Sequence, residues 1–206
     1  MSHITRLFGV FGRRVDELHK HGTFFLVVGP SGAGKDTLLD AAKLRLADDP
    51  YYLFARRAIT RPSLPSDEDH EEVSDEEFAR RANASDFCLY WEAHGLKYGI
   101  PMKYELERQQ GRHIIANTSR EVAVKARKYL ASVKIIVVTA PIEILSERLA
   151  ARNRETRDDI NARLARTGPD DVKMKGAITV TNNSTIDEGV ERFLAILKDF
   201  RLASAD

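Results

Sequence analysis

The sequence predicts an α/β fold, in which helices cover a parallel β-sheet. Two observations support this class: short apolar runs alternate with helix-sized amphipathic stretches, and a glycine-rich loop joins the first apolar run to the first helix. The chain of 206 residues has the length of one large domain and shows no internal repeat, low-complexity segment or linker. We therefore expect a single domain over residues 1–206, in which residues 1–22 form an N-terminal extension.

The strands and helices are expected in a defined order after that extension. Residues 23–28 (TFFLVV) form a continuous apolar run, which is typical of a central parallel strand covered on both faces. Further strands are expected at residues 113–116, 134–139 and 177–181. Helices are expected from residue 37 onward and over residues 121–130, 142–152 and 187–202, where apolar positions recur at helical spacing. Another helix is expected to begin at Ser74, because Ser74 and Glu77 have the spacing of a capping box.

The composition excludes several classes of protein. The apolar fraction of 43% is ordinary for a soluble protein, and the longest apolar runs fall short of the ~18 residues that a membrane helix needs. Residues 7–11 are too short for a signal-peptide core, so we expect a cytoplasmic protein without a membrane segment. Cys88 is the only cysteine and therefore allows no internal disulfide. A net charge of +1 argues against a nucleic-acid-binding protein, so any anion site must be local.

The glycine-rich loop is the most specific motif of the chain. It reads GPSGAGK over residues 29–35, directly after a predicted buried strand and at the start of a predicted helix, as a phosphate loop requires. Its glycines let the backbone curl around an anion, where amide N–H groups converge with the positive end of the helix dipole. Lys35 adds a charge for the β- and γ-phosphates and is a candidate catalytic residue. We expect ATP to contact the loop and its first helical residues: Gly29, Pro30, Ser31, Gly32, Ala33, Gly34, Lys35, Asp36 and Thr37.

Asp36 departs from the usual form of this motif, in which Ser or Thr follows the lysine and binds Mg²⁺ through its hydroxyl. One interpretation is that the helix dipole stabilises Asp36 while Thr37 supplies the hydroxyl. The other is that the Asp36 carboxylate holds Mg²⁺ directly or through water. The second interpretation gains support from Asn117, which ends a predicted strand where phosphate-loop enzymes commonly have a metal-assisting acid. We hypothesise that Asp36 replaces that charge as the metal ligand.

Two segments are candidates for binding a second substrate. Arg61 follows an extended stretch at residues 52–59, where its guanidinium could clamp a phosphate. Residues 67–70 belong to an acidic run and fit either a solvated loop or the acceptor site. Trp91 is expected in the core, whereas Tyr98 fits core packing and substrate binding equally well.

Polar residues also follow the predicted strands. Asn117, Ser119 and Arg120 come after the strand at residues 113–116, at the carboxyl end where open parallel sheets bind their ligands. We expect Arg120 to contact an acceptor phosphate, the alternative being a surface ion pair. Asn182 and Asn183 follow the last predicted strand, where they fit a turn.

The basic residues near residue 150 complete the set of candidates. Arg148 and Arg152 are four residues apart and share one helix face, and Arg163 follows in the same polar stretch. On spacing alone, a catalytic role and a solvated, salt-bridged helix are equally consistent with them.

Taken together, GPSGAGK, the ITR segment at residues 59–61, the Tyr98-Gly99 pair and RLAARNRETRDDINARL at residues 148–164 resemble the guanylate kinase family. The resemblance covers nearly the whole chain from Thr23. It implies a five-stranded parallel sheet flanked by helices, an acceptor-binding insert at about residues 52–100 and an arginine-bearing lid at about residues 148–167. It further implies that Arg148, Arg152 and Arg163 surround the transferred phosphoryl group. It also implies that Asn182 and Asn183 contact the ATP base or ribose.

The chain departs from guanylate kinases where that family reads guanine: Leu64, Leu89, Ile100 and Asn117 stand at those positions. It is more similar to the ribose 1,5-bisphosphate phosphokinases, through GKD at the phosphate loop, W-x-x-x-G-L-x-Y-G at residues 91–99 and N-x-S-R at residues 117–120. This resemblance implies an ATP- and Mg²⁺-dependent kinase that forms 5-phosphoribosyl 1-diphosphate (PRPP) from ribose 1,5-bisphosphate in phosphonate catabolism. The substrate-binding residues would be Arg61, Tyr98, Asn117, Ser119 and Arg120.

Two alternatives stay open. One is a guanylate kinase or another nucleoside monophosphate kinase, and the other is a catalytically silent binding module. Silent modules commonly lose the phosphate-loop lysine or the lid arginines, which are all present here as Lys35, Arg148, Arg152 and Arg163. The oligomeric state is not predicted.

Overall fold

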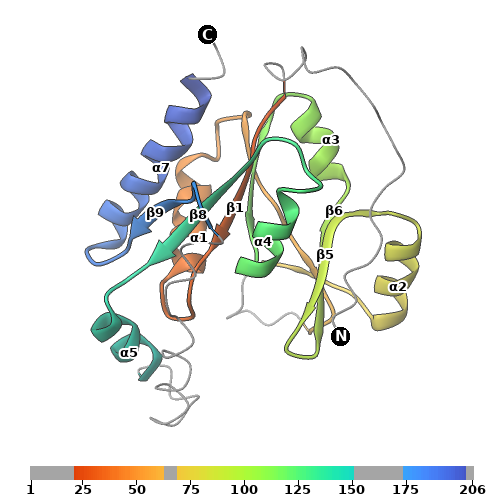
Figure 1. Ribbon diagram of the computed structural model, residues 1–206, viewed down its shortest axis with the longest axis horizontal. Helices are drawn as coiled ribbons and strands as arrows, with labels where there is room; N and C mark the ends of the chain where they lie inside the picture. The colour runs from red at the N-terminus through yellow and green to blue at the C-terminus, as the bar shows by residue number, and fades with distance from the viewer. Residues whose placement is uncertain (1–20, 63–68, 151–173, 203–206) are drawn as a thin grey trace. The chain divides into compact units, whose positions relative to one another are not determined.

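The computed structural model describes residues 21–62, 69–150 and 174–202 (Figure 1). The larger sheet has the strand order β2 (Tyr52–Phe54), β7 (His113–Asn117), β1 (Phe24–Val28), β8 (Val133–Thr139) and β9 (Ile178–Thr181). Parallel pairing joins β2 to β7 and β8 to β9. The predicted α/β class with a five-stranded parallel sheet is therefore confirmed.

A second sheet of four strands accompanies the first. Its order is β4 (Glu71–Glu72), β3 (Ala58–Ile59), β6 (Leu96–Pro101) and β5 (Phe87–Ala93). The helices are α1 (Lys35–Arg45), α2 (Asp75–Asn83), α3 (Lys103–Gln109), α4 (Arg120–Ala126), α5 (Ile142–Ala150) and α7 (Ile186–Leu202). Within the described ranges, no helix combines the length and the apolar character needed to span a membrane.

The described residues form two compact units. The first unit comprises residues 21–25, 49–116 and 125–133, and the second comprises residues 26–48, 117–124 and 134–202, without the gaps named above. This division concerns compactness, so the expectation of one domain over residues 1–206 stays a prediction.

The predicted strand, loop and helix follow one another directly as β1, the phosphate loop and α1, and the loop and α1 belong to the second unit. All five residues of β1 are buried, as the continuous apolar run indicates. Helix α7 buries the stripe that its spacing predicts, namely Val190, Phe193, Leu194 and Leu197. Helix α1 packs against α7, and Arg45 of α1 forms ion pairs with Asp187 and Glu191 of α7.

The first unit contains a hairpin that the sequence did not predict. Strands β5 and β6 pair antiparallel, and His94 and Gly95 between them have φ angles of 53° and 73°. Two positive φ angles are what a two-residue hairpin turn of type I′ requires. Because His-Gly is a weaker turn signal than Asn-Gly, the pattern gave no clear hairpin.

Helix α2 packs beside this hairpin (Figure 1). The side chain of Ser74 caps the helix by accepting a hydrogen bond of 3.1 Å from the backbone N–H of Glu77, which confirms the predicted helix start. Phe78 is buried against Phe87 and Tyr90, and its ring stacks on that of Phe87 with centroids 4.7 Å apart. The hydrophobic face of α2 is therefore fixed by aromatic contacts with β5.

Candidate active site

The phosphate loop lies in the second unit, between the end of β1 and the start of α1. Gly34 precedes the helix in a left-handed conformation with φ 80°, and a Cβ atom there would lie 2.5 Å from Nδ2 of Asn182. A Cβ atom on Gly29 would lie 2.0 Å from the carbonyl oxygen of Val138. The glycines are therefore required because the loop is packed closely against β8 and the segment after β9.

The side chain of Lys35 folds back onto this loop. Its Nζ donates hydrogen bonds to the carbonyl oxygens of Gly29 and Pro30, at 2.9 and 3.0 Å. Lys35 is the first residue of α1, so the helix N-terminus and the ammonium place positive charge at the same loop. This arrangement suits a phosphate chain.

Asp36 and Asn117 lie in contact beside the loop. Nδ2 of Asn117, the last residue of β7, donates a hydrogen bond of 2.9 Å to Oδ1 of Asp36. Asp36 carries an acid where Ser or Thr is usual, and Asn117 stands where an acid is usual. These two positions are therefore in contact. Asp36 and the neighbouring Thr37 are exposed, and they offer the oxygen ligands that Mg²⁺ prefers.

These donors fit a magnesium–nucleotide site better than a metal cage made by the protein alone. Among the described residues, no cluster of three or more His, Cys, Asp or Glu side chains is found. Mg²⁺ at nucleotide sites commonly takes one or two protein ligands, with phosphates and water completing its octahedron. The residues at the phosphate loop match that requirement.

Asn182 holds the loop from the side of β9. Its side chain is buried, and its Nδ2 donates a hydrogen bond of 2.8 Å to the carbonyl oxygen of Ala33. Its backbone N–H donates to the carbonyl oxygen of Thr139 at 2.7 Å, which continues the pairing of β8 with β9. The structure thus gives Asn182 a role that the sequence did not indicate, because its amide fastens the phosphate loop.

Arg148 is the lid arginine that the structure describes. It lies on α5, and its Nη1 approaches the carbonyl oxygen of Asn182 at 3.4 Å. The same Nη1 would lie 3.6 Å from a Cβ atom on Gly34, so the guanidinium is close to the loop. Arg152, Arg163 and the rest of the predicted lid beyond Ala150 lie outside the described residues.

The segment after β7 returns to the second unit. The N–H of Thr118 donates to the carbonyl oxygen of Val27 at 3.0 Å, which holds the end of β7 beside the end of β1. The side chain of Ser119 accepts a hydrogen bond of 3.2 Å from the N–H of Val122 and so caps α4. Arg120, half-buried, begins that helix. Asn117, Ser119 and Arg120 therefore belong to the same compact unit as the phosphate loop.

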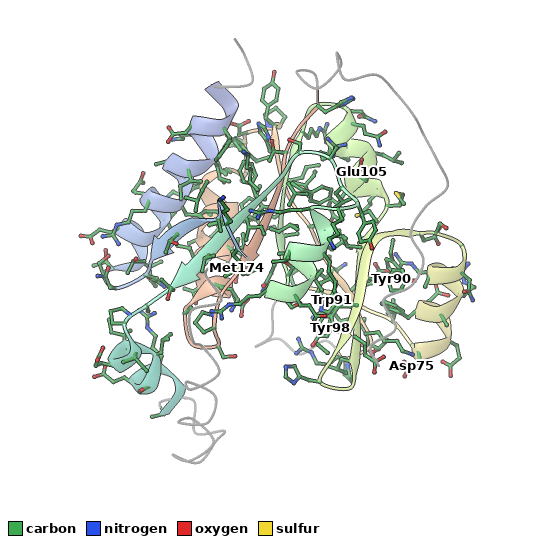
Figure 2. All side chains as sticks on the ribbon, in the orientation of Figure 1. Asp75, Tyr90, Trp91, Tyr98, Glu105 and Met174 are labelled. Atoms are coloured by element: carbon green, nitrogen blue, oxygen red, sulfur yellow. The ribbon has the colours of Figure 1, made fainter. Side chains whose placement is uncertain are left out.

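The remaining candidates, Arg61 and Tyr98, lie in the first unit. Tyr98 of β6 pairs with Trp91 of β5, and the two rings stack with centroids 5.3 Å apart and planes 8° apart. The guanidinium of Arg57 lies over both rings, at 5.3 Å from the centroid of Tyr98 and 5.8 Å from that of Trp91. Figure 2 shows these rings on the opposite side of the hairpin from Tyr90, which points toward α2.

Arg57 is a residue that the sequence reasoning missed. It is only 9% exposed, and cations over aromatic rings are stabilised most when they are removed from water. The available signal was the period-2 placement of Arg57 and Ile59, which puts both side chains on one face of the extended stretch at residues 52–59.

His70 contacts the ITR segment, and both His70 and Asp69 accept hydrogen bonds from Arg56. His70 is fully buried, and its Nε2 lies 3.1 Å from the carbonyl oxygen of Arg61. Since a carbonyl oxygen can only accept, the proton of this hydrogen bond belongs to His70 Nε2. Arg56 binds Oδ1 of Asp69 at 2.7 Å and the carbonyl oxygen of His70 at 2.9 Å. These two residues of the acidic run thus have structural contacts, and residues 63–68 lie outside the described part.

Relatives with curated names point to one family. A ribose 1,5-bisphosphate phosphokinase of Methylobacterium radiotolerans is 43% identical over 177 residues, which cover 86% of this chain and 98% of that protein. A protein of the same name from Acidiphilium cryptum is 46% identical over 178 residues, covering 86% of this chain and 93% of that protein. A bifunctional ribose 1,5-bisphosphokinase-thymidine phosphorylase of Cupriavidus pinatubonensis is 47% identical over 182 residues, or 88% of this chain. The chain spans 30% of the length of that bifunctional relative.

The comparison of structures agrees on the fold. Guanylate kinase from Anaplasma phagocytophilum superposes with a TM-score of 0.63 and 20% sequence identity, over 87% of this chain and 86% of that one. No protein-family model matches the chain. The fold is that of guanylate kinase, and since relatives at 43 to 46% identity align along most of their own length, the chain belongs to the family of ribose 1,5-bisphosphate phosphokinases.

Proposed function

We propose that the chain is an ATP-dependent kinase that phosphorylates ribose 1,5-bisphosphate to PRPP in phosphonate catabolism. The observation that carries this proposal is the alignment with a relative of that name over 98% of the relative's length. The phosphate loop, with Lys35 folded onto it, supplies the site that a phosphoryl donor needs. A cytoplasmic location stays a prediction.

The donor half of the reaction is assigned to the second unit. The loop residues from Gly29 to Thr37 would hold the phosphates of ATP, with Lys35 neutralising charge on the β- and γ-phosphates. Asp36, with the hydroxyl of Thr37, would hold Mg²⁺, which supplies charge neutralisation when bound. We assign Asn182 a place in the nucleotide site through its bond to Ala33, in addition to the predicted contact with base or ribose.

The chemistry needs little proton transfer. An oxygen of the acceptor's 1-phosphate, already ionised, attacks the γ-phosphorus of ATP; the bond from that phosphorus to the bridging oxygen breaks, and ADP leaves with the electron pair. Charge accumulates on the transferred group, and Arg148, with Arg152 and Arg163, would stabilise it. Arg148 already lies near the loop, at hydrogen-bond range of the Asn182 carbonyl.

The acceptor half is assigned to Arg61, Tyr98, Asn117, Ser119 and Arg120. An acceptor with two phosphates and no base suits cationic and hydroxyl side chains. Leu89 and Ile100 pair across the hairpin and are both buried. Apolar groups cannot pair with the polar edge of guanine, and each unpaired buried polar group costs about 1–3 kcal/mol. GMP is therefore disfavoured as acceptor.

The test is a comparison of acceptors. The protein is incubated with ATP, Mg²⁺ and either ribose 1,5-bisphosphate or a panel of nucleoside monophosphates, and ADP release is followed. We expect rapid release only with the sugar bisphosphate, and its loss in Lys35→Met. Rapid turnover of GMP with no turnover of the sugar bisphosphate would establish the nucleoside monophosphate kinase instead, and nucleotide binding without any turnover would establish the silent module.

A further inference from the structure

The contact between Asp36 and Asn117 has a consequence for the metal site. In many phosphate-loop enzymes, a Ser or Thr hydroxyl follows the lysine and an Asp lies at the end of a neighbouring strand. Here the carboxylate follows Lys35, and the neutral amide ends β7. We infer that these two residues have exchanged roles: Asp36 provides the single carboxylate of the metal site, and Asn117 is a positioning residue that orients it. The inference rests on the proposed binding of ATP and Mg²⁺, but not on the identity of the acceptor.

The backbone fixes both partners. Asn117 ends a strand whose next residue, Thr118, donates its N–H to the carbonyl oxygen of Val27. Asp36 is the second residue of α1, directly after the lysine that contacts the loop. Donor and acceptor therefore come from two regular elements that meet at the phosphate loop. A ligand supported in this way keeps its orientation better than one on a loop.

The charge of the pair explains why an amide accompanies this carboxylate. The hydrogen bond from Asn117 Nδ2 reaches Oδ1 of Asp36 at 2.9 Å. This bond orients the carboxylate through Oδ1, and the second oxygen, Oδ2, can bind a cation or its water. Two carboxylates at this separation would repel each other, whereas an amide donates a hydrogen bond to the carboxylate and adds no charge. The pair is therefore built for one negative charge.

The contribution of this contact to folding is small. Asp36 is exposed and Asn117 is partly exposed, and a hydrogen bond in such a place adds only about 0.5–1.5 kcal/mol to stability. Groups that orient a metal ligand commonly change metal affinity about 10–100-fold when removed. Metal affinity is thus the property on which a positioning role and a merely structural role differ.

The experiment measures Mn²⁺ binding in the presence of saturating ADP, by the electron paramagnetic resonance signal of the free ion. Mn²⁺ replaces Mg²⁺ because both prefer oxygen ligands in octahedral geometry. We expect Asp36→Asn and Asn117→Leu each to weaken Mn²⁺ binding about tenfold or more. The exchanged double variant, Asp36→Asn with Asn117→Asp, should bind Mn²⁺ within about threefold of the wild type, because it keeps one carboxylate and one amide in contact.

Two controls make the outcomes distinct. Asp40→Asn removes an exposed acid one turn further along α1 and should leave Mn²⁺ binding unchanged. ADP affinity measured in EDTA should be equal in all variants, which shows that the loop is intact. Wild-type Mn²⁺ affinity in Asp36→Asn or in Asn117→Leu would overturn the inference, and a double variant as weak as Asp36→Asn would overturn the exchange of roles. If the wild type bound no ADP, the proposed function itself would fail, and this inference with it.

Discussion

The bond between Asn182 and the phosphate loop gives a quantitative prediction. The side-chain amide of Asn182 donates a hydrogen bond of 2.8 Å to the carbonyl oxygen of Ala33. Asn182 is 7% exposed and Ala33 is fully buried, so water cannot replace this donor. Asn182→Leu keeps a similar side-chain size and removes the donor. The lost hydrogen bond and the buried carbonyl left behind together cost about 2 kcal/mol. For a chain of this length, that loss lowers Tm by about 4–8 °C.

The assay separates a loop-fastening role from a contact with the ATP base or ribose. If Asn182 acts through the loop, Asn182→Leu should lower the affinities for ATP and for inorganic tripolyphosphate by the same factor. A loss of about 2 kcal/mol corresponds to a factor of up to about 30. If Asn182 contacts the base or ribose instead, only the affinity for ATP should fall. Isothermal titration calorimetry with both ligands, together with thermal unfolding, measures all three quantities.

Asn183→Ala is the matched control, because Asn183 is the next residue, is exposed and contacts Arg192 instead of the loop. It should change neither Tm nor the affinity for tripolyphosphate. An unchanged Tm in Asn182→Leu, with full tripolyphosphate affinity, would refute the reasoning.

Four further predictions concern turnover, thiol reactivity, the pH dependence of stability and core packing. Arg152→Ala should lower kcat about 10³-fold or more while changing ATP affinity little, because an arginine in this role stabilises charge in the transition state. Equal losses of kcat, from steady-state kinetics, and of ATP affinity, from titration, would count against this role. Burial raises the pKa of Cys88 from 9.0 to about 12, so at pH 8 the native thiol should react with iodoacetamide about a thousandfold more slowly than in urea. Since the unfolded thiol ionises near pH 9 and the folded one near 12, this group also makes stability fall as pH rises through that window, and Cys88→Ala should flatten the fall. Phe78→Ala should lower the free energy of unfolding by about 3–5 kcal/mol, measured by urea denaturation, because it empties a site stacked on Phe87; a loss below 1 kcal/mol would contradict the packing.

Elements with a strong local signal could be predicted from the sequence. β1 is an unbroken apolar run, and the buried stripe of α7 repeats at helical spacing, so each pattern needs no distant residue for its interpretation. The β5–β6 hairpin carries apolar or aromatic residues on both faces, and its stability comes from cross-strand pairs such as Trp91 with Tyr98. Such pairs have no signature within either strand alone, which is why the hairpin was missed.

The sequence by itself determined the phosphate loop, because the glycines, the lysine and the flanking strand and helix are contiguous and their chemistry is local. It also indicated the family, through GKD and the motifs at residues 91–99 and 117–120. Only the tertiary structure decided which distant groups meet: Asn117 reaches Asp36 across 81 positions, Asn182 reaches Ala33 across 149, and Arg57 lies over a stacked ring pair from β5 and β6. Hydrogen bonds and ring contacts act over a few ångströms, so their partners are set by strand order and register rather than by spacing along the chain.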